Sequence, residues 1–214
     1  MLDFLNNIRR AEKKISLTRQ AINTAAAALL GIALGTLSKF LDTVPVNNLP
    51  ALLQYLDVTN FLGRFAIWVF IAVCISIYSS SSVRAAINVF LFFAGMVLSY
   101  YLYSSFMAGF FPKSYAMIWI GFTVVSPLLA FICWYAKGQG RISLILSAGI
   151  IAVLFNMSFV YGIGYFKSLS LLETLTFLCG CAVMKRQSVA DTVIMIAIGV
   201  ALAFVLDIVI PFSF

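Results

Sequence analysis

The feature that most constrains this chain is a succession of long apolar stretches separated by short polar breaks. The breaks include residues 79–84 (SSSSVR), 137–141 (KGQGR) and 185–188 (KRQS), and the stretches between them carry almost no charge. A helix of about 20 mostly apolar residues crosses the hydrocarbon core of a bilayer. A helix also satisfies its own backbone hydrogen bonds, which lipid cannot do. The pattern therefore predicts an all-α, polytopic integral membrane helical bundle.

Seven stretches are candidates for transmembrane helices. They are residues 21–40, 61–78, 85–106, 115–135, 142–161, 169–184 and 189–210. The sixth is the shortest, so it either thins the bilayer locally or re-enters without crossing, which would leave six spans. Residues 20–214 are thus expected to form a single transmembrane domain, preceded by a basic segment, residues 1–19.

The first eighteen residues are predicted to form an amphipathic helix. Leu5, Ile8 and Ile15 fall near one helical face, and basic side chains surround the rest. Such a helix lies along lipid headgroups on the cytoplasmic side. The alternative is a docking handle for a cytoplasmic partner such as an ATPase, and nothing in the segment separates the two.

Orientation follows from the distribution of Lys and Arg, which concentrate in cytoplasmic segments. With the N-terminus inside, the inner basic residues are Arg9, Arg10, Lys13, Lys14, Arg19, Arg84, Lys137, Arg141, Lys185 and Arg186, and the outer ones are Lys39, Arg64, Lys113 and Lys167. This predicts a plasma-membrane protein with a cytoplasmic N-terminus and its C-terminus on the outer side. The same bias explains the pI of about 9.4 without a special basic patch, so no nucleic-acid partner is expected.

The residue types give little support to an enzyme. The chain has no histidine, which removes the commonest metal ligand and the usual general base near neutral pH. Cys74 and Cys133 lie in different stretches, and Cys179 and Cys181 point to nearly opposite sides of a helix. We therefore expect no cofactor, no metal site and no catalytic residue.

Two carboxylates fall inside predicted spans, where an ionisable group is costly and marks a functional hypothesis. Glu173 shares a helical face with Ser170, Thr176 and Gly180, and Asp207 lies near the outer end of the last span. Both would face an outward-opening cavity. The alternative is that both lie close enough to the surface to be solvated, or to pair with Lys167, Lys39 or Arg64 as structural anchors.

Further groups that stack and hydrogen-bond gather in the outer halves of the spans. Asn156, Tyr100 and Trp119 complete the candidate substrate-binding set with Glu173 and Asp207. An aromatic belt at the headgroup level explains the rings equally naturally, although it does not explain Asn156. Residues 49–57 (LPALLQYLD) form an apolar segment too short to span, either a lid over the cavity or a resting surface turn.

Small residues recur in the first span. Ala27, Gly31 and Gly35 form a stripe that lets another helix approach closely, either within the chain or in a partner membrane subunit. Pro127 is expected to kink the fourth span.

Three functions follow, in order of preference. The first is a small membrane transport component that binds or translocates a small solute through an outward-facing polar and aromatic cavity. The second is a non-enzymatic accessory, sensor or immunity-type protein acting through helix docking, and the third is a membrane-embedded enzyme acting on lipid. In size, small-residue first span and basic tail, the chain resembles the substrate-binding membrane subunits of energy-coupling-factor vitamin transporters. That resemblance covers architecture alone and implies no binding residue.

Overall fold

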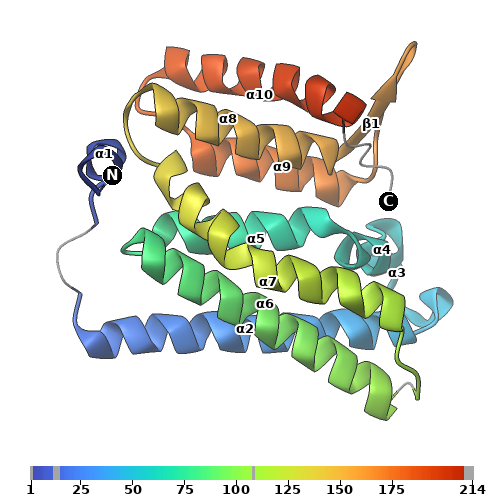
Figure 1. Cartoon of the computed structure of the whole chain (residues 1–214). Coiled ribbons are helices and arrows are strands. Elements are labelled where there is room, and N and C mark those ends of the chain that lie inside the picture. Colours follow the sequence, from blue (N-terminus) through green and yellow to red (C-terminus); the bar gives the residue numbers. More distant parts are fainter. Residues whose placement is uncertain (1, 12–14, 108, 210–214) are drawn as a thin grey trace. The chain divides into compact units, whose positions relative to one another are not determined.

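The computed structural model describes residues 2–11, 15–107 and 109–209, which are mostly helical (Figure 1). The elements in chain order are α1 (Leu2–Ile8), α2 (Leu17–Thr43), a 3-10 turn η1 (Val46–Asn48), α3 (Ala51–Tyr55), α4 (Val58–Gly63), α5 (Phe65–Tyr78), α6 (Ser82–Met107), α7 (Lys113–Ala136), α8 (Gly140–Asn156), β1 (Phe159–Gly162), β2 (Tyr165–Ser168), α9 (Leu171–Met184) and α10 (Val189–Val209). The predicted all-α class is confirmed, with one short hairpin added.

Four of these helices are long and apolar enough to cross a membrane, namely α2, α6, α7 and α10, with 27, 26, 24 and 21 residues. The apolar helices α5, α8 and α9 are shorter, at 14, 17 and 14 residues. At about 1.5 Å per residue, a 14-residue helix is shorter than a hydrocarbon core of about 30 Å. The long helices identify an integral membrane protein.

The chain forms two compact units. Unit 1 comprises Met1–Arg10, Tyr55–Cys74 and Tyr135–Phe214, and unit 2 comprises Ala11–Gln54 and Ile75–Trp134. Each unit is described by itself. The single domain predicted for residues 20–214 stays a prediction.

In unit 2, α2 and α6 lie side by side at backbone contact. A Cβ atom added to Gly31 would collide with the carbonyl oxygen of Phe92, and one added to Gly35 would collide with that of Met96. From the other helix, a Cβ on Gly95 would lie 2.7 Å from the carbonyl oxygen of Ala28. The small-residue stripe, with Ala27 also buried, therefore seats an intramolecular helix pair.

In unit 1, α8 contacts both α9 and α10, and the β1–β2 hairpin extends beyond the ends of these helices (Figure 1). Gly199 brings α10 close to α8, because a Cβ there would lie 2.9 Å from the carbonyl oxygen of Ala148. The strands pair antiparallel with Phe159 opposite Ser168 and Gly162 opposite Tyr165. Gly164 supplies the positive φ of 84° that the tight turn requires.

Three predicted boundaries are wrong. The helix predicted for residues 1–18 ends at Ile8, and Ser16 caps the start of α2 by accepting a hydrogen bond from the Arg19 amide; Lys13 and Lys14 lie outside the described residues. The span predicted for residues 61–78 is broken at Arg64, whose backbone is extended between α4 and α5. The span predicted for residues 142–161 ends at Asn156, and the rest of it forms β1.

Helix α7 runs through Pro127 without a break. Proline has no N–H, so the carbonyl of Thr123, four residues earlier, loses its helical donor. The hydroxyl of Ser126 donates to that carbonyl at 2.8 Å. A neighbouring side chain thus satisfies the group that proline leaves open, as is usual for membrane helices.

Candidate functional site

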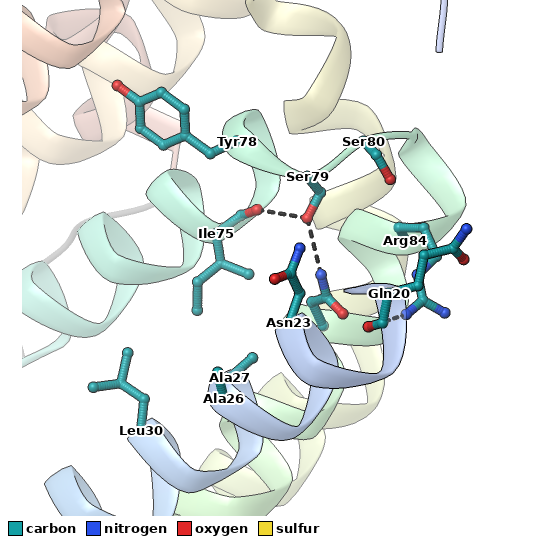
Figure 2. A pocket seen from close by; sticks show the side chains of 11 residues that line it. Gln20, Asn23, Ala26, Ala27, Leu30, Ile75, Tyr78, Ser79, Ser80 and Arg84 are labelled. Carbon is teal, nitrogen blue, oxygen red and sulfur yellow. Dashed lines mark hydrogen bonds between the residues drawn. The ribbon is translucent and has the colours of Figure 1, made fainter. Parts of the chain in front are cut away.

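A cavity of about 270 Å³ lies in unit 2, at the N-terminal end of α2 and the turn between α5 and α6 (Figure 2). Its size is near the lower end of the range typical of small-molecule pockets, roughly 300–1,000 Å³. Residues from α2, α5, the turn and α6 line it: Gln20, Asn23, Ala26, Ala27, Leu30, Ile75, Tyr78, Ser79, Ser80, Arg84 and Asn88. The lining thus combines an apolar floor with amide, hydroxyl and guanidinium groups, and no carboxylate belongs to it.

A continuous hydrogen-bond chain backs this pocket. Arg84 Nη2 donates to Thr24 Oγ1 at 2.6 Å and to the carbonyl of Gln20 at 2.7 Å. The Thr24 hydroxyl donates to Asn88 Oδ1 at 2.7 Å, and Asn88 Nδ2 donates to Ser79 Oγ at 3.1 Å. Asn88 is only 6% exposed. Since an unpaired amide in such a place costs about 1–3 kcal/mol, the network holds the pocket's polar wall in one arrangement.

Ser79, the last residue of this hydrogen-bond network, is also held in place. Ser79 Oγ donates to the Ile75 carbonyl at 2.7 Å, and the indole Nε1 of Trp134 donates to the Ser79 carbonyl at 2.7 Å. Trp134 is 1% exposed. The turn after α5 is therefore tied to α6 and α7 within unit 2, so the pocket is preformed.

Other polar groups around the pocket can form further hydrogen bonds. In the part of the chain that the structure describes, no group pairs with the amide of Asn23 or with the hydroxyls of Tyr78 and Ser80. Asn23 is exposed and lies beside Ser79 at the pocket (Figure 2). These groups, together with the charge of Arg84, suit a solute that presents hydrogen-bond acceptors.

The predicted residue Glu173 lies in unit 1 and is fully buried in the first turn of α9. Its Oε1 accepts from Arg64 Nη1 at 2.6 Å, and its Oε2 accepts from the hydroxyl of Ser170. Arg64 also lies 3.8 Å from Asp57, from Nη2 to Oδ2. Of the partners considered for Glu173, Arg64 is the one that the structure provides, and the carboxylate is fully engaged.

Ser170 precedes α9 and caps it, whereas the sequence interpretation placed it within the helix. Its hydroxyl accepts a hydrogen bond from the amide of Leu172 at 3.2 Å. Ser and Glu three residues apart are the pattern of a capping box. A carboxylate there also complements the positive end of the helix dipole. Thr176 and Gly180 share the buried face of α9 with Glu173, as predicted.

Asn156 and Asp207 also lie in unit 1. Asn156 is 5% exposed, donates from Nδ2 to the carbonyl of Ala203 at 3.0 Å, and accepts from the hydroxyl of Tyr161 at 2.6 Å. Tyr161 lies in β1, outside the spanning helices, and its pKa is raised by burial and then by the charge of Asp207. Asn156 thus joins α8, α10 and the hairpin, with Asp207 nearby.

Tyr100 and Trp119 belong to unit 2. The Tyr100 hydroxyl donates to Asp42 Oδ2 at 3.4 Å, and Lys39 Nζ lies 5.2 Å from the Tyr100 ring centre. Lys39 itself is 4% exposed and pairs with Asp42 at 2.6 Å. Trp119 is 5% exposed and packs edge-on against Tyr115 and Phe122. The predicted site residues are therefore divided between the two units, three in unit 1 and two in unit 2.

The sequence interpretation missed the pocket of Figure 2. Its signal was Asn23 and Asn88, two amides within stretches that are otherwise apolar, with Arg84 one turn before Asn88. Polar side chains inside membrane helices are themselves markers of function or of helix association. The sequence interpretation considered the carboxylates within the spans and did not consider these two amides.

Four membrane-length helices, and a polar pocket lined by α2, the end of α5, the turn after it and α6, define a helical integral membrane protein with a candidate ligand site. The chain belongs to DUF6518, a family of unknown function, whose model matches residues 14–211. No curated protein and no solved structure matches the chain.

Proposed function

We propose that this protein is a small membrane transport component that binds a small, acceptor-rich polar solute in the pocket formed by α2, α6 and the turn between α5 and α6. The observation that carries the proposal is the hydrogen-bond network from half-buried Arg84 through Thr24 to buried Asn88, which lies beside a cavity with further polar groups that have no partner among the described residues. A purely structural network would need these hydrogen bonds but would not need the pocket beside them.

The solute class follows from the lining. Arg84 is the charged residue of the pocket, and the lining contains no carboxylate to neutralise it. Amides and hydroxyls add donors and acceptors, and the floor of Ala26, Ala27 and Leu30 is apolar. A carboxylate or other compact anionic solute with a short apolar body fits this combination.

The proposed topology has seven transmembrane helices, with α5, α8 and α9 as short or locally thinned spans. The N-terminus is cytoplasmic and the C-terminus is on the outer side, in the plasma membrane, as the Lys and Arg bias predicts. In this orientation the pocket opens toward the cytoplasmic half, since Gln20 and Arg84 lie at inner helix ends. A reporter fused to the C-terminus tests the odd number of spans, because a cytoplasmic reporter would require an even number.

An outward-facing site on Glu173, Asp207, Asn156, Tyr100 and Trp119 stays a prediction. It has less support than the pocket, because Glu173 and Asn156 already bond to neighbouring groups of the protein. Glu173→Gln would test it, but that change also breaks an ion pair.

The accessory function also stays a prediction, and so do the docking roles of the N-terminal segment and of a partner membrane subunit. The main support for the accessory function was the stripe of small residues in the first span, Ala27, Gly31 and Gly35. Helix α6 packs against Gly31 and Gly35, so a partner protein would need to bind another surface. The transport proposal is therefore preferred.

The decisive experiment uses Asn23, because this side chain lines the pocket without supporting the fold. We expect native mass spectrometry of the protein released from mild detergent to show a bound small molecule. Asn23→Leu is expected to lower its occupancy about five- to ten-fold, because the loss of one hydrogen bond costs about 1–1.4 kcal/mol.

Asn47→Leu is the matched control, since Asn47 is exposed in the turn η1 and lies outside the pocket. It should leave occupancy unchanged. Equal occupancy in wild type and Asn23→Leu would refute the pocket as the binding site.

A further inference from the structure

Three half-buried cations come from three different segments of unit 1. Arg9 follows α1, Lys137 lies in the turn between α7 and α8, and Arg186 lies in the turn between α9 and α10. Other basic residues of the same segments, Arg10, Arg141 and Lys185, are exposed. The sequence interpretation treated all six as a general positive-inside bias, whereas the structure separates them into two groups by burial.

The segments are joined by direct contacts. The amide of Gln139 donates to the carbonyl of Ile8 at 2.8 Å, and Ile8 is 7% exposed. Gly138 lies against the same carbonyl, where a Cβ atom would collide with it. Arg9 and Lys137 are the residues next to this contact, so the two cations are brought close together.

Lys137 and Arg186 reach across between the two turns. Lys137 Nζ donates to the carbonyl of Lys185 at 3.0 Å. Arg186 Nη1 donates to the carbonyl of Ala136 at 3.0 Å and to Ser143 Oγ at 2.8 Å. These contacts fix both side chains and leave the Nη2 and Nε groups of Arg186 and further protons of Lys137 for a ligand.

Lys137 and Arg186 concentrate positive charge at these two turns. Neither Lys137 nor Arg186 forms an ion pair with any carboxylate that the structure describes. Asp191, in the first turn of α10, is exposed and not bonded to them. Burial lowers the pKa of Lys137, and the charges of Arg186 and Arg9 lower it further. Like charges that are held together in this way favour an anion between them.

We propose that Lys137 and Arg186, with Arg9 beside them, form a binding site for the phosphate of an anionic membrane lipid. Guanidinium and ammonium groups are the usual phosphate ligands. The site lies at the ends of membrane helices, where headgroups lie, and basic pockets between such helices bind anionic headgroups. The site belongs to unit 1, separate from the solute pocket, and does not depend on it.

The test compares matched variants of the full chain in lipid mixtures. Purified protein is equilibrated with equal parts of phosphatidylglycerol and phosphatidylcholine, and the retained lipid is measured by native mass spectrometry. Lys137→Gln is expected to reduce retained phosphatidylglycerol about five-fold, the effect of one basic residue near a membrane surface. Arg141→Gln, which removes an exposed charge from the start of α8, is expected to have little effect.

Thermal unfolding distinguishes lost binding from a damaged fold. In detergent without lipid, Lys137→Gln should be as stable as wild type or more stable, because it relieves repulsion while the Gln amide can still donate to the Lys185 carbonyl. With phosphatidylglycerol added, wild type should gain more stability than the variant.

Three results would overturn the proposal. The first is an equal loss of lipid in Lys137→Gln and Arg141→Gln, which would show a general surface charge. The second is stabilisation of wild type by inorganic phosphate but not by phosphatidylglycerol, which would identify a soluble ligand. The third is a lower stability of Lys137→Gln in both conditions, which would show a structural residue.

Discussion

The buried pair of Arg64 and Glu173 gives the sharpest prediction for stability. Glu173 is fully buried, whereas the Arg64 side chain is 34% exposed. Arg64→Ala would leave a buried carboxylate with Ser170 as its remaining side-chain partner. Breaking a buried ion pair from one side costs about 3–5 kcal/mol. Glu173→Gln should cost less, because the remaining charge on Arg64 reaches solvent and lies near Asp57.

The expected changes in melting temperature are large enough to measure. For a protein of 150–250 residues, 1 kcal/mol corresponds to about 2–4 °C in Tm. Arg64→Ala should therefore lower Tm in detergent by roughly 6–20 °C, with a smaller decrease for Glu173→Gln. The double variant Arg64→Ala with Glu173→Gln should be more stable than Arg64→Ala alone, because it leaves no buried charge.

Asp57→Asn is the control for a surface charge, because Asp57 is exposed to 44% and its contact with Arg64 is long. An exposed pair contributes about 0–1 kcal/mol. The reasoning is refuted if Arg64→Ala costs no more than Asp57→Asn, or if the double variant is no better than Arg64→Ala.

Further predictions concern packing and hydrogen bonding. Gly31→Ala should destabilise the protein by about 1–3 kcal/mol by forcing α2 from α6, whereas Gly121→Ala, with open space at its Cβ position, should unfold at the wild-type temperature or above. Asn88→Leu should cost about 1–3 kcal/mol in denaturant unfolding by leaving Thr24 and Ser79 without their amide partner; an unchanged midpoint would contradict this. Tyr161→Phe should cost about 1 kcal/mol at neutral pH through its bond to Asn156. Because the pKa of Tyr161 is raised in the folded state, the difference in unfolding free energy between wild type and Tyr161→Phe should shrink as pH rises above about 10. A difference that grows at alkaline pH would refute this hydrogen bond.

The helical class and the four long helices could be predicted from the sequence, because uninterrupted apolar length is sufficient evidence for them. The break at Arg64 could not, since hydropathy does not record the ion pair that Arg64 forms with Glu173, a residue far away in the chain. The hairpin had a local signal, two aromatic-rich runs around Ile163-Gly164. The apolar character of the surrounding stretch concealed it.

The candidate site was harder to predict than the fold. Glu173 was correctly singled out as an unusual buried carboxylate, but its burial turned out to be compensated by Arg64 and Ser170. Whether a buried polar group is satisfied depends on tertiary contacts, which hydropathy does not record. The pocket beside Arg84 and Asn88 arises from the same kind of contacts, between α2, α6 and the turn before it.

The most direct test of the central claim is an experimental density map of the protein purified in mild detergent, inspected at the pocket beside Asn23 and Arg84. The account predicts density for a compact solute with an acceptor group within hydrogen-bond distance of the Arg84 guanidinium or the Asn23 amide. A pocket filled by a lipid acyl chain, or closed by its own side chains, would contradict it.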